Sequence, residues 1–369
     1  MKFSVSRESL LKQLQLVVGV VERRQTLPIL SNVLIELDGS GGRLAVTGTD
    51  LEVEVVSHSN LDGAGYVGGE VTVAARKLLD ICRSLPEQAT INFSTENNQA
   101  LVTSGRSKFT LATQPANEFP RVEEGSGELE FACTAAELKQ LIDKTAFAMA
   151  HQDVRYYLNG MLWEATEGQL RAVATDGHRL AMTTLGLSVS SQSKVQSILP
   201  RKGVVELSRL LTEEDEVKVV IGENHLRVKG DGFHFTSKLV DGAYPDYDRV
   251  IPRDGALRIT GDRETLRHAF SRTAILSNEK YRGVRLAFSD NLLTMSATNP
   301  EQEEAEEEVE VSYNGEEFEV GFNVSYILDV LNTLNGDTVS FSLSDANSSA
   351  LLEDVSETNS VYVIMPMRL

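Results

Sequence analysis

Very few residues of this chain combine the types and the spacing that catalysis or cofactor binding requires. Gly63, Gly65 and Gly68 form a G-x-G-x-x-G pattern, which binds a dinucleotide where it leaves a strand and opens a helix. Here it is followed by Glu70-Val-Thr-Val73, whose alternation is typical of a strand. The six histidines show no metal-binding spacing such as H-E-x-x-H, and neither a G-x-S-x-G motif nor a Walker loop occurs. The sequence therefore predicts no catalytic residue, no metal site and no cofactor.

His178, within Thr175-Asp-Gly-His-Arg179, is the histidine that could most readily act as a general base. No nucleophile can be named beside it, and a histidine in a turn after a strand needs no chemical role. We therefore interpret His178 as a turn residue, and we rank a hydrolase or a transferase below a non-catalytic binding protein.

The composition limits the class of protein further. The chain has 369 residues, with 35 Lys and Arg against 54 Asp and Glu and a formal net charge of −19. Taken alone, this charge argues against a nucleic-acid partner, because phosphate binding depends on Lys and Arg. Two cysteines do not make a disulfide framework or a zinc ribbon, no signal peptide is visible, and no apolar run reaches the length of a membrane span. We expect a cytoplasmic protein without membrane association.

The chain repeats one design three times: a short strand, a capping residue and an amphipathic helix. The capping residues Ser6, Thr134 and Asp262 are separated by 128 residues and again by 128, and all three types accept the free N–H groups of a helix start. Thr134 and Glu137 also form a capping box. Three strand ends repeat at offsets of 126 and 123 residues, namely Gly48-Thr-Asp50, Ala174-Thr-Asp176 and Ala297-Thr-Asn299.

A second helix recurs in each repeat, and strands of period 2 separated by Gly, Asn and Asp turns fill the rest. Each repeat then holds two helices and roughly eight strands. This predicts an α+β fold of three homologous domains, 1–125, 126–253 and 254–369, with both helices on one side of antiparallel sheets.

The predicted helices are more basic than the rest of the chain. Their approximate spans are 6–20, 74–85, 134–149, 200–211, 262–276 and 323–334, which together contain thirteen basic and eight acidic residues. Cations are common on any solvated helix face, and the last span has none. Even so, the positive charge is concentrated on one repeated element.

An acidic run and a basic strand lie at different ends of the chain. Residues 301–310 contain seven glutamates and fall on a strand position of the third repeat. Such a strand edge either avoids pairing or meets a basic partner, and Gly105-Arg-Ser-Lys-Phe-Thr-Leu111 is one candidate. Opposite charges on the two ends permit head-to-tail association that closes into a ring. The C-terminal segment 361–369 is apolar and is longer than an edge strand that closes a sheet would have to be. Its last apolar residues indicate a surface for partner peptides.

The sequence resembles the bacterial β sliding clamp family, the processivity subunits of the replicative DNA polymerase. The resemblance covers essentially the whole chain. Its most specific stretches are Thr26-Leu-Pro-Ile-Leu30, His151-Gln-Asp-Val-Arg-Tyr-Tyr-Leu-Asn-Gly160, Ala174-Thr-Asp-Gly-His-Arg-Leu180, Phe235-Thr-Ser-Lys-Leu239, Ala274-Ile-Leu-Ser-Asn-Glu-Lys280 and Met365-Pro-Met-Arg-Leu369.

The resemblance implies a clamp fold closed into a ring by a head-to-tail homodimer, which encircles duplex and primed DNA. It also implies partners that carry a clamp-binding motif: the replicative polymerase, the clamp loader and repair proteins. By this resemblance the DNA contacts are Arg24, Arg76, Gln152, Tyr156 and Tyr157. Guanidinium groups suit phosphates, and tyrosines can stack on single-stranded bases, although Tyr157 is also compatible with a place in the core.

The resemblance further implies a peptide pocket and a subunit interface. The pocket residues are Leu158, Thr175, Gly177, His178, Arg179, Leu180, Pro245, Arg249, Val250, Ser349, Val363, Met365, Pro366, Met367 and Arg368. Asn347 stands where relatives have an apolar residue, which leaves the fine preference of the pocket open. The interface residues are Arg106, Lys108, Phe109, Leu111, Ile275, Leu276, Glu301, Glu304 and Glu307. The alternative is a homo-oligomeric protein-binding scaffold that does not encircle DNA.

Overall fold

A computed structural model describes residues 1–22, 27–61, 65–122, 127–187, 194–212, 216–253, 255 and 257–368. Arg24, Gly63 and the predicted domain boundary between residues 125 and 126 lie outside these ranges. The chain divides into two compact units. The first unit is Met1–Leu138 with Lys202–Leu239, and the second is Lys139–Arg201 with Val240–Leu369.

The described part of the chain contains six α-helices, two in each predicted repeat. They are α1 (Arg7–Val17), α2 (Ala75–Ser84), α3 (Ala135–Asp143), α4 (Arg201–Leu210), α5 (Arg263–Thr273) and α6 (Val324–Thr333). The predicted caps are confirmed: the Ser9 N–H donates to the Ser6 hydroxyl, and the Thr265 N–H donates to the Asp262 carboxylate. The Thr134–Glu137 capping box is reciprocal, because each main-chain N–H donates to the other side chain, at 2.9 and 3.2 Å.

The predicted C-terminal ends of three helices were wrong. α1, α3 and α5 were expected to reach residues 20, 149 and 276, but they end at Val17, Asp143 and Thr273. After α3 the Thr145 N–H donates to the Ile142 oxygen, three residues back, and Ala146–Ala148 form a separate 3-10 turn. A 3-10 turn, Ala274–Leu276, also follows α5, and after α1 the Val20 N–H donates to the Val17 oxygen, three residues back. Buried apolar residues such as Val20, Ala148 and Ala274 continue into these turns, so the hydrophobic period alone overestimates the helix.

Twenty-four strands are present in the described ranges, eight in each repeat, which agrees with the predicted α+β class. They are β1 (Lys2–Ser6), β2 (Asn32–Leu37), β3 (Arg43–Thr49), β4 (Val53–Asn60), β5 (Gly69–Ala74), β6 (Thr90–Glu96), β7 (Gln99–Ser104), β8 (Ser107–Gln114), β9 (Leu129–Thr134), β10 (Gly160–Thr166), β11 (Gln169–Thr175), β12 (Arg179–Gly186), β13 (Val195–Pro200), β14 (Glu216–Ile221), β15 (His225–Gly230), β16 (Phe233–Lys238), β17 (Leu257–Asp262), β18 (Gly283–Ser289), β19 (Leu292–Thr298), β20 (Glu304–Glu310), β21 (Phe318–Asn323), β22 (Thr338–Leu343), β23 (Ala350–Asp354) and β24 (Ser360–Ile364).

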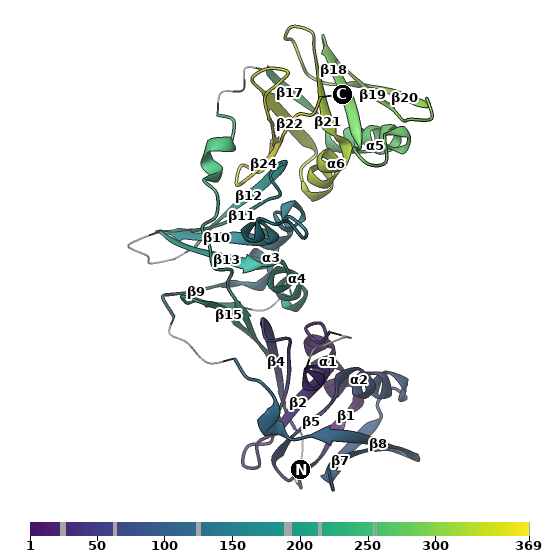
Figure 1. Cartoon of the computed structure of the whole chain (residues 1–369), viewed down its shortest axis with the longest axis vertical. Helices are drawn as coiled ribbons and strands as arrows, with labels where there is room; N and C mark the ends of the chain where they lie inside the picture. The colour runs from purple at the N-terminus through teal and green to yellow at the C-terminus, as the bar shows by residue number, and fades with distance from the viewer. Residues whose placement is uncertain are drawn as a thin grey trace. The chain divides into compact units, whose positions relative to one another are not determined.

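The first unit is built on one continuous antiparallel sheet of twelve strands, in the order β1-β6-β7-β8-β5-β2-β3-β4-β16-β15-β14-β9. β4 of the first repeat pairs with β16 of the second, with Ser57 opposite Phe233 and Val53 opposite Ser237. α1 and α2 pack against each other and against strands β2 to β5 (Figure 1). Backbone hydrogen bonds therefore join the first and second repeats.

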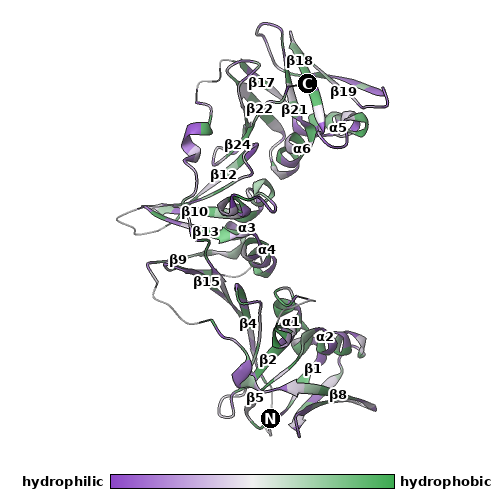
Figure 2. Cartoon of the chain, viewed as in Figure 1, coloured by the Kyte–Doolittle hydropathy of each residue, from purple (hydrophilic) through white to green (hydrophobic). Residues whose placement is uncertain are grey.

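The second unit holds a sheet of eight strands, β13-β10-β11-β12-β24-β23-β22-β17, and a sheet of four, β20-β19-β18-β21. Here β12 of the second repeat pairs with β24 of the third, with Arg179 opposite Ile364 and Thr183 opposite Ser360. Hydrophobic residues follow the strands of the unit, while the hairpin between β19 and β20 is hydrophilic (Figure 2). None of the helices in the described part has the length and hydrophobicity needed to cross a membrane.

Candidate functional site

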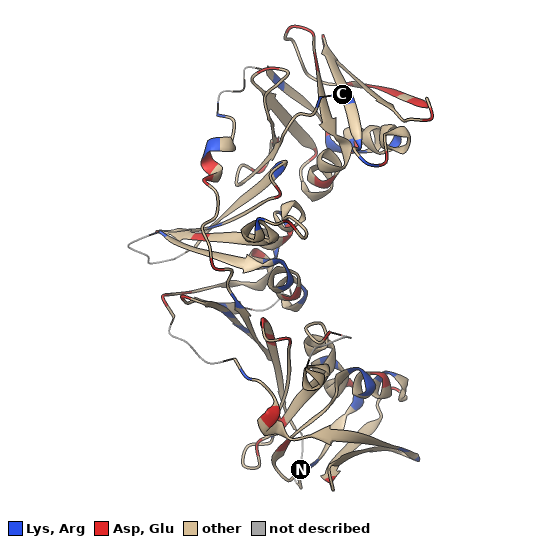
Figure 3. Cartoon of the chain, in the orientation of Figure 1, with Lys and Arg blue, Asp and Glu red and all other residues tan. Residues whose placement is uncertain are grey.

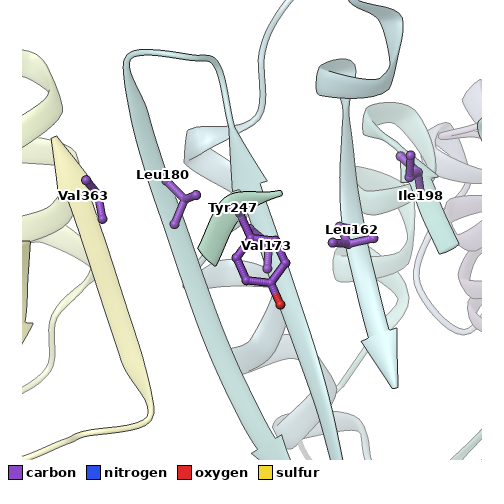
Figure 4. Packing of buried hydrophobic residues seen from close by; sticks show 6 residues of the cluster. All are labelled: Leu162, Val173, Leu180, Ile198, Tyr247 and Val363. Carbon is purple, nitrogen blue, oxygen red and sulfur yellow. The ribbon is translucent and has the colours of Figure 1, made fainter. Parts of the chain in front are cut away.

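The second unit contains an apolar cavity of about 160 Å³ at the junction between its central and C-terminal strands. Its lining comes from the ends of strands β11, β12 and β24 and from a short 3-10 turn, Tyr247–Val250, near the end of the central repeat. Three of its lining residues, Leu180, Tyr247 and Val363, belong to a buried cluster, and Figure 4 shows Leu180 and Val363 of that cluster on neighbouring strands. The cluster consists of Leu162, Val173, Leu180, Ile198, Tyr247 and Val363. Such a cavity suits large apolar side chains from a ligand.

One rim of the cavity is a tight turn after β11. Gly177 has a φ of +90°, and a Cβ atom there would lie 3.0 Å from the guanidinium of Arg155. The Arg155 guanidinium donates two hydrogen bonds to the Asp153 carboxylate, at 3.0 and 2.9 Å. These hydrogen bonds lower the pKa of Asp153 to about 2. Glycine at this position thus lets a charged side chain lie flat over the turn.

Arg179 connects the cavity to the C-terminal repeat. Its guanidinium pairs with Asp176 at 3.1 Å and with Asp329 on α6, and it donates to the main-chain oxygen of Phe147 at 2.8 Å. The ring of Tyr326 lies against the guanidinium face. All of these partners belong to the second unit, so Arg179 fixes the cavity rim to α6.

The structure brings ten of the fifteen predicted pocket residues together around this cavity. They are Leu158, Thr175, Gly177, His178, Arg179, Leu180, Pro245, Val250, Val363 and Met365. Arg249, Ser349 and Pro366 are not among its lining residues. Met367 and Arg368 line a different cavity, beside Tyr281 and Arg285. Asn347 lies in a turn and donates its N–H to Asp345.

Three lining residues were missed from the sequence: Arg155, Asp246 and Tyr247. Asp246 and Tyr247 lie between the predicted residues Pro245 and Val250, and Arg155 precedes Tyr156 in the stretch His151–Gly160, so the signal for all three was their position beside predicted residues. His178 lies at the cavity, and its main-chain oxygen accepts the Met365 N–H at 2.9 Å. Within the described ranges, no group of three or more His, Cys, Asp and Glu side chains is placed to hold a metal ion.

The predicted DNA contacts are distributed over both units. Arg76 lies on α2 in the first unit and donates to the main-chain oxygen of Val21 at 3.2 Å. In the second unit, Gln152 has a φ of +56°, and Tyr156 is 58% exposed. Tyr157 packs partly against the buried cluster, with its ring edge-to-face with Tyr156 at 5.8 Å between centroids. Arg24 lies outside the described residues.

The helical cations differ in whether a carboxylate neutralises them. Arg267 pairs with Glu264, Arg272 pairs with Glu307, and Lys202 pairs with Glu22. In contrast, Lys12, Arg76, Lys77 and Arg83 are exposed on α1 and α2, and no carboxylate of the described residues forms an ion pair with them. Figure 3 shows the resulting basic residues on α2. The unneutralised positive charge of the helices is therefore concentrated on the first repeat.

The predicted interface residues lie on two strand edges, in the turns beside them and in the 3-10 turn Ala274–Leu276. Among the described residues, β20 pairs only with β19, and β8 pairs with β5 at just two positions, so residues 107–112 of β8 have a free edge. Arg106 and Lys108 are exposed on the β7–β8 hairpin and β8. Phe109 and Leu276 are half-buried, Leu111 is buried, and Ile275 is 74% exposed. Glu304 and Glu307 lie on β20, and Glu301 lies in the turn before it.

Comparisons with known proteins cover the chain from end to end. Family models for the N-terminal, central and C-terminal domains of the DNA polymerase III beta subunit match residues 1–123, 132–246 and 248–368. The beta sliding clamp of Pseudomonas aeruginosa is 60% identical, and that of Escherichia coli K12 is 51% identical, each over 100% of both chains. A crystal structure of the Pseudomonas aeruginosa clamp bound to griselimycin superposes with a TM-score of 0.97 at 59% identity, again over 100% of both chains. The chain therefore belongs to the DNA polymerase III beta subunit family, the sliding clamps that act as non-catalytic processivity factors of DNA polymerase.

Proposed function

We propose that two copies of this chain close head-to-tail into a ring around duplex and primed DNA. Within the ring, the apolar cavity of the second unit binds short peptides of the replicative polymerase, the clamp loader and other motif-bearing proteins. The observation that carries the cavity assignment is the convergence of ten predicted residues on one apolar cavity. We also propose that the three domains span 1–125, 126–253 and 254–369, and that the protein acts in the cytoplasm.

Ring closure is supported by the way the repeats join within each unit. Strand β4 of the first repeat pairs with β16 of the second, and β12 of the second repeat pairs with β24 of the third. The strand of the third repeat that is equivalent to β4 and β12 is β20. The strand of the first repeat that is equivalent to β16 and β24 is β8, so the same pattern would pair β20 of one copy with β8 of another. In the described part of the chain, β20 and residues 107–112 of β8 have unpaired edges, so each is free for a second copy of the chain.

The register of this proposed junction follows from the two existing ones. Ser57 faces Phe233, and its equivalent Thr183 faces Ser360. The same positions in β20 and β8 are Glu306 and Ser107. This register brings Arg106 opposite Glu307, brings Lys108 beside Glu304 and leaves Phe109 and Leu111 to meet Ile275 and Leu276. Because Glu307 already pairs with Arg272 at 2.6 Å, the proposed pair with Arg106 would extend an existing ion pair.

DNA contact is supported by the charge on α1 and α2. A duplex needs cations that are not already neutralised, and four exposed cations without an ion pair among the described residues lie together on these helices. Their small number fits weak contact, which lets a ring slide while its closed topology retains the DNA. Tyr156 and Gln152 are the exposed candidates of the second unit for the primed strand.

Retention on circular DNA tests this proposal. The protein is loaded on a nicked circle by a clamp loader with ATP, the loader is washed away, and retention is measured before and after the circle is linearised. We expect retention on the circle and rapid loss from the linear form, with loss prevented when both ends are blocked by bound protein. Equal retention on the circular and the open linear DNA would contradict encirclement.

A further inference from the structure

One wall of the apolar cavity belongs to no sheet. Pro245 and Val250 line the cavity from a segment that leaves β16 and continues towards β17. The Val240 N–H donates to the Ile198 oxygen at 2.9 Å, and this is the last main-chain hydrogen bond between the segment and the sheet among the described residues. Side chains must therefore hold this wall in place.

Two tyrosine hydroxyls anchor the segment. The Tyr244 hydroxyl accepts the main-chain N–H of Thr175 at 3.1 Å, which fixes the segment to the cavity rim. Tyr247 is 5% exposed, its ring lies in the buried cluster (Figure 4), and its hydroxyl donates to Oε1 of Glu164 at 2.8 Å. Arg171 donates from Nη1 to the same hydroxyl at 2.9 Å. Tyr247 thus lines the cavity with its ring and bonds to the sheet with its oxygen.

Glu164 is suited to hold this hydroxyl because its carboxylate is buried and accepts hydrogen bonds from several neighbouring side chains. It is 4% exposed on β10, and its Oε2 accepts from Lys194 at 2.6 Å and from Gln196 at 2.8 Å. Burial acts to raise the pKa of Glu164, but the hydrogen bonds from Lys194, Tyr247 and Gln196 outweigh it and lower the pKa. An ionised acceptor forms stronger hydrogen bonds than a neutral one.

We propose that Glu164 and Tyr247 are positioning residues that set the affinity of the cavity for peptides without touching the peptide through their polar atoms. The inference rests on the proposed function of the cavity and names residues outside the set implied by the resemblance. When the Tyr247–Glu164 hydrogen bond is lost, the ring, Pro245 and Val250 are no longer held in one arrangement. The peptide must then order the wall as it binds, which weakens binding.

The test measures binding of a fluorescent peptide with Leu and Phe anchors to the full-length protein by anisotropy. We expect Tyr247→Phe and Glu164→Ala each to weaken binding about tenfold. The double variant should be no weaker than either single variant, since both remove the same bond. Glu164→Gln keeps a neutral acceptor oxygen and should weaken binding less than Glu164→Ala does. Tyr66→Phe, which removes a hydroxyl in the first unit, is the matched control and should bind like the unaltered protein.

The outcomes separate this inference from the proposed function. If the unaltered protein does not bind the peptide, or if Met365→Ala binds equally well, the cavity assignment itself fails. If the peptide binds and Met365→Ala weakens it, but Tyr247→Phe and Glu164→Ala bind like the unaltered protein, the positioning role alone is overturned. Thermal unfolding is followed for every variant, and the Glu164→Ala and Glu164→Gln pair decides the question if Tyr247→Phe unfolds. Equal weakening in Glu164→Ala and Glu164→Gln would also overturn it.

Discussion

The guanidinium carbon of Arg179 lies 4.4 Å from the centre of the Tyr326 ring, so that a charged side chain at the cavity rim stacks on helix α6. The ring of Phe147 approaches the same group at 5.3 Å. The planar guanidinium can form hydrogen bonds through the N–H groups at its edge while its faces stack on aromatic rings. Arg179 therefore links the rim of the cavity to the C-terminal repeat through its side chain, in addition to the main-chain hydrogen bond from Met365 to His178.

Replacing Arg179 tests this link. Arg179→Lys keeps the charge but loses the planar fork and the stacking, so we expect the free energy of unfolding to fall by about 1–3 kcal/mol. Urea unfolding followed by circular dichroism measures the change. Arg249→Lys, at an exposed arginine of the same unit, is the control and should leave stability unchanged. Equal stability of the two variants would show that the stacking of Arg179 does not contribute to the free energy of unfolding.

The proposed subunit interface predicts a change of mass in solution. Arg106→Glu combined with Lys108→Glu places like charges opposite the acidic strand β20, so the pair of chains should separate. Light scattering should then give about 40.5 kDa, the mass of one chain, in place of twice that value. Lys218→Glu with Lys229→Glu reverses two charges on strands that are already paired, and it should leave the mass unchanged. A dimer that survives the first pair of changes would rule out this interface.

The unpaired cations predict a graded effect on DNA binding. Arg76→Ala should weaken binding to duplexes of any sequence. It should also reduce the slope of log affinity against log salt concentration by about one, because one phosphate contact is lost. Arg267→Ala removes a guanidinium that Glu264 already neutralises, so it should change both quantities much less. Binding measured over a range of salt concentrations gives the two slopes. If both variants behave alike, ion pairing within the chain does not decide which helical cations meet DNA.

Glu54 predicts a pH dependence of stability. Burial raises its pKa, although the hydrogen bond from the Val122 N–H lowers it in part. The folded chain then binds a proton more readily than the unfolded chain, so this group lowers stability as the pH rises above 4.5, its ordinary value. Glu54→Gln should gain stability over the unaltered protein at pH 7 and lose that gain at pH 4. Urea unfolding across this range measures the difference, with the exposed Glu96→Gln as the control; a gain independent of pH would contradict the assignment.

Local patterns in the sequence predict local structure well here. Ser6, Thr134 and Asp262 cap helices as expected, because a capping hydrogen bond spans only three residues. The three repeats and their strands also follow from the sequence, since residue spacing is preserved through all three copies. The ends of α1, α3 and α5 did not follow, because apolar residues continue into the turns after these helices, where hydrogen bonds span three residues instead of four.

The cavity could be predicted only where the resemblance supplied it. Tyr247 contributes a ring to the cavity and a hydroxyl to Glu164, which lies 83 residues away in the chain, and no local spacing reveals such a pair. The charge of the helices shows the same limit. A count of cations cannot distinguish Arg267, whose carboxylate partner is three residues away, from Lys77, which is exposed and has no carboxylate partner in the described part of the chain.

The division of the central repeat between the two units bears on how the chain comes apart. Its strands β9 and β14 to β16 belong to the sheet of the first unit, while β10 to β13 belong to the second. Cooperative opening follows shared hydrogen bonds, so the blocks that melt together should be the two units and not the three repeats. Amide hydrogens of Val53–Ser57 should exchange with solvent at the same pace as those of Phe233–Ser237, although the two segments belong to different repeats. If the chain were cut between the first and second repeats and the two fragments were separated, the amide hydrogens of β4 and β16 would lose the hydrogen bonds that protect them from exchange.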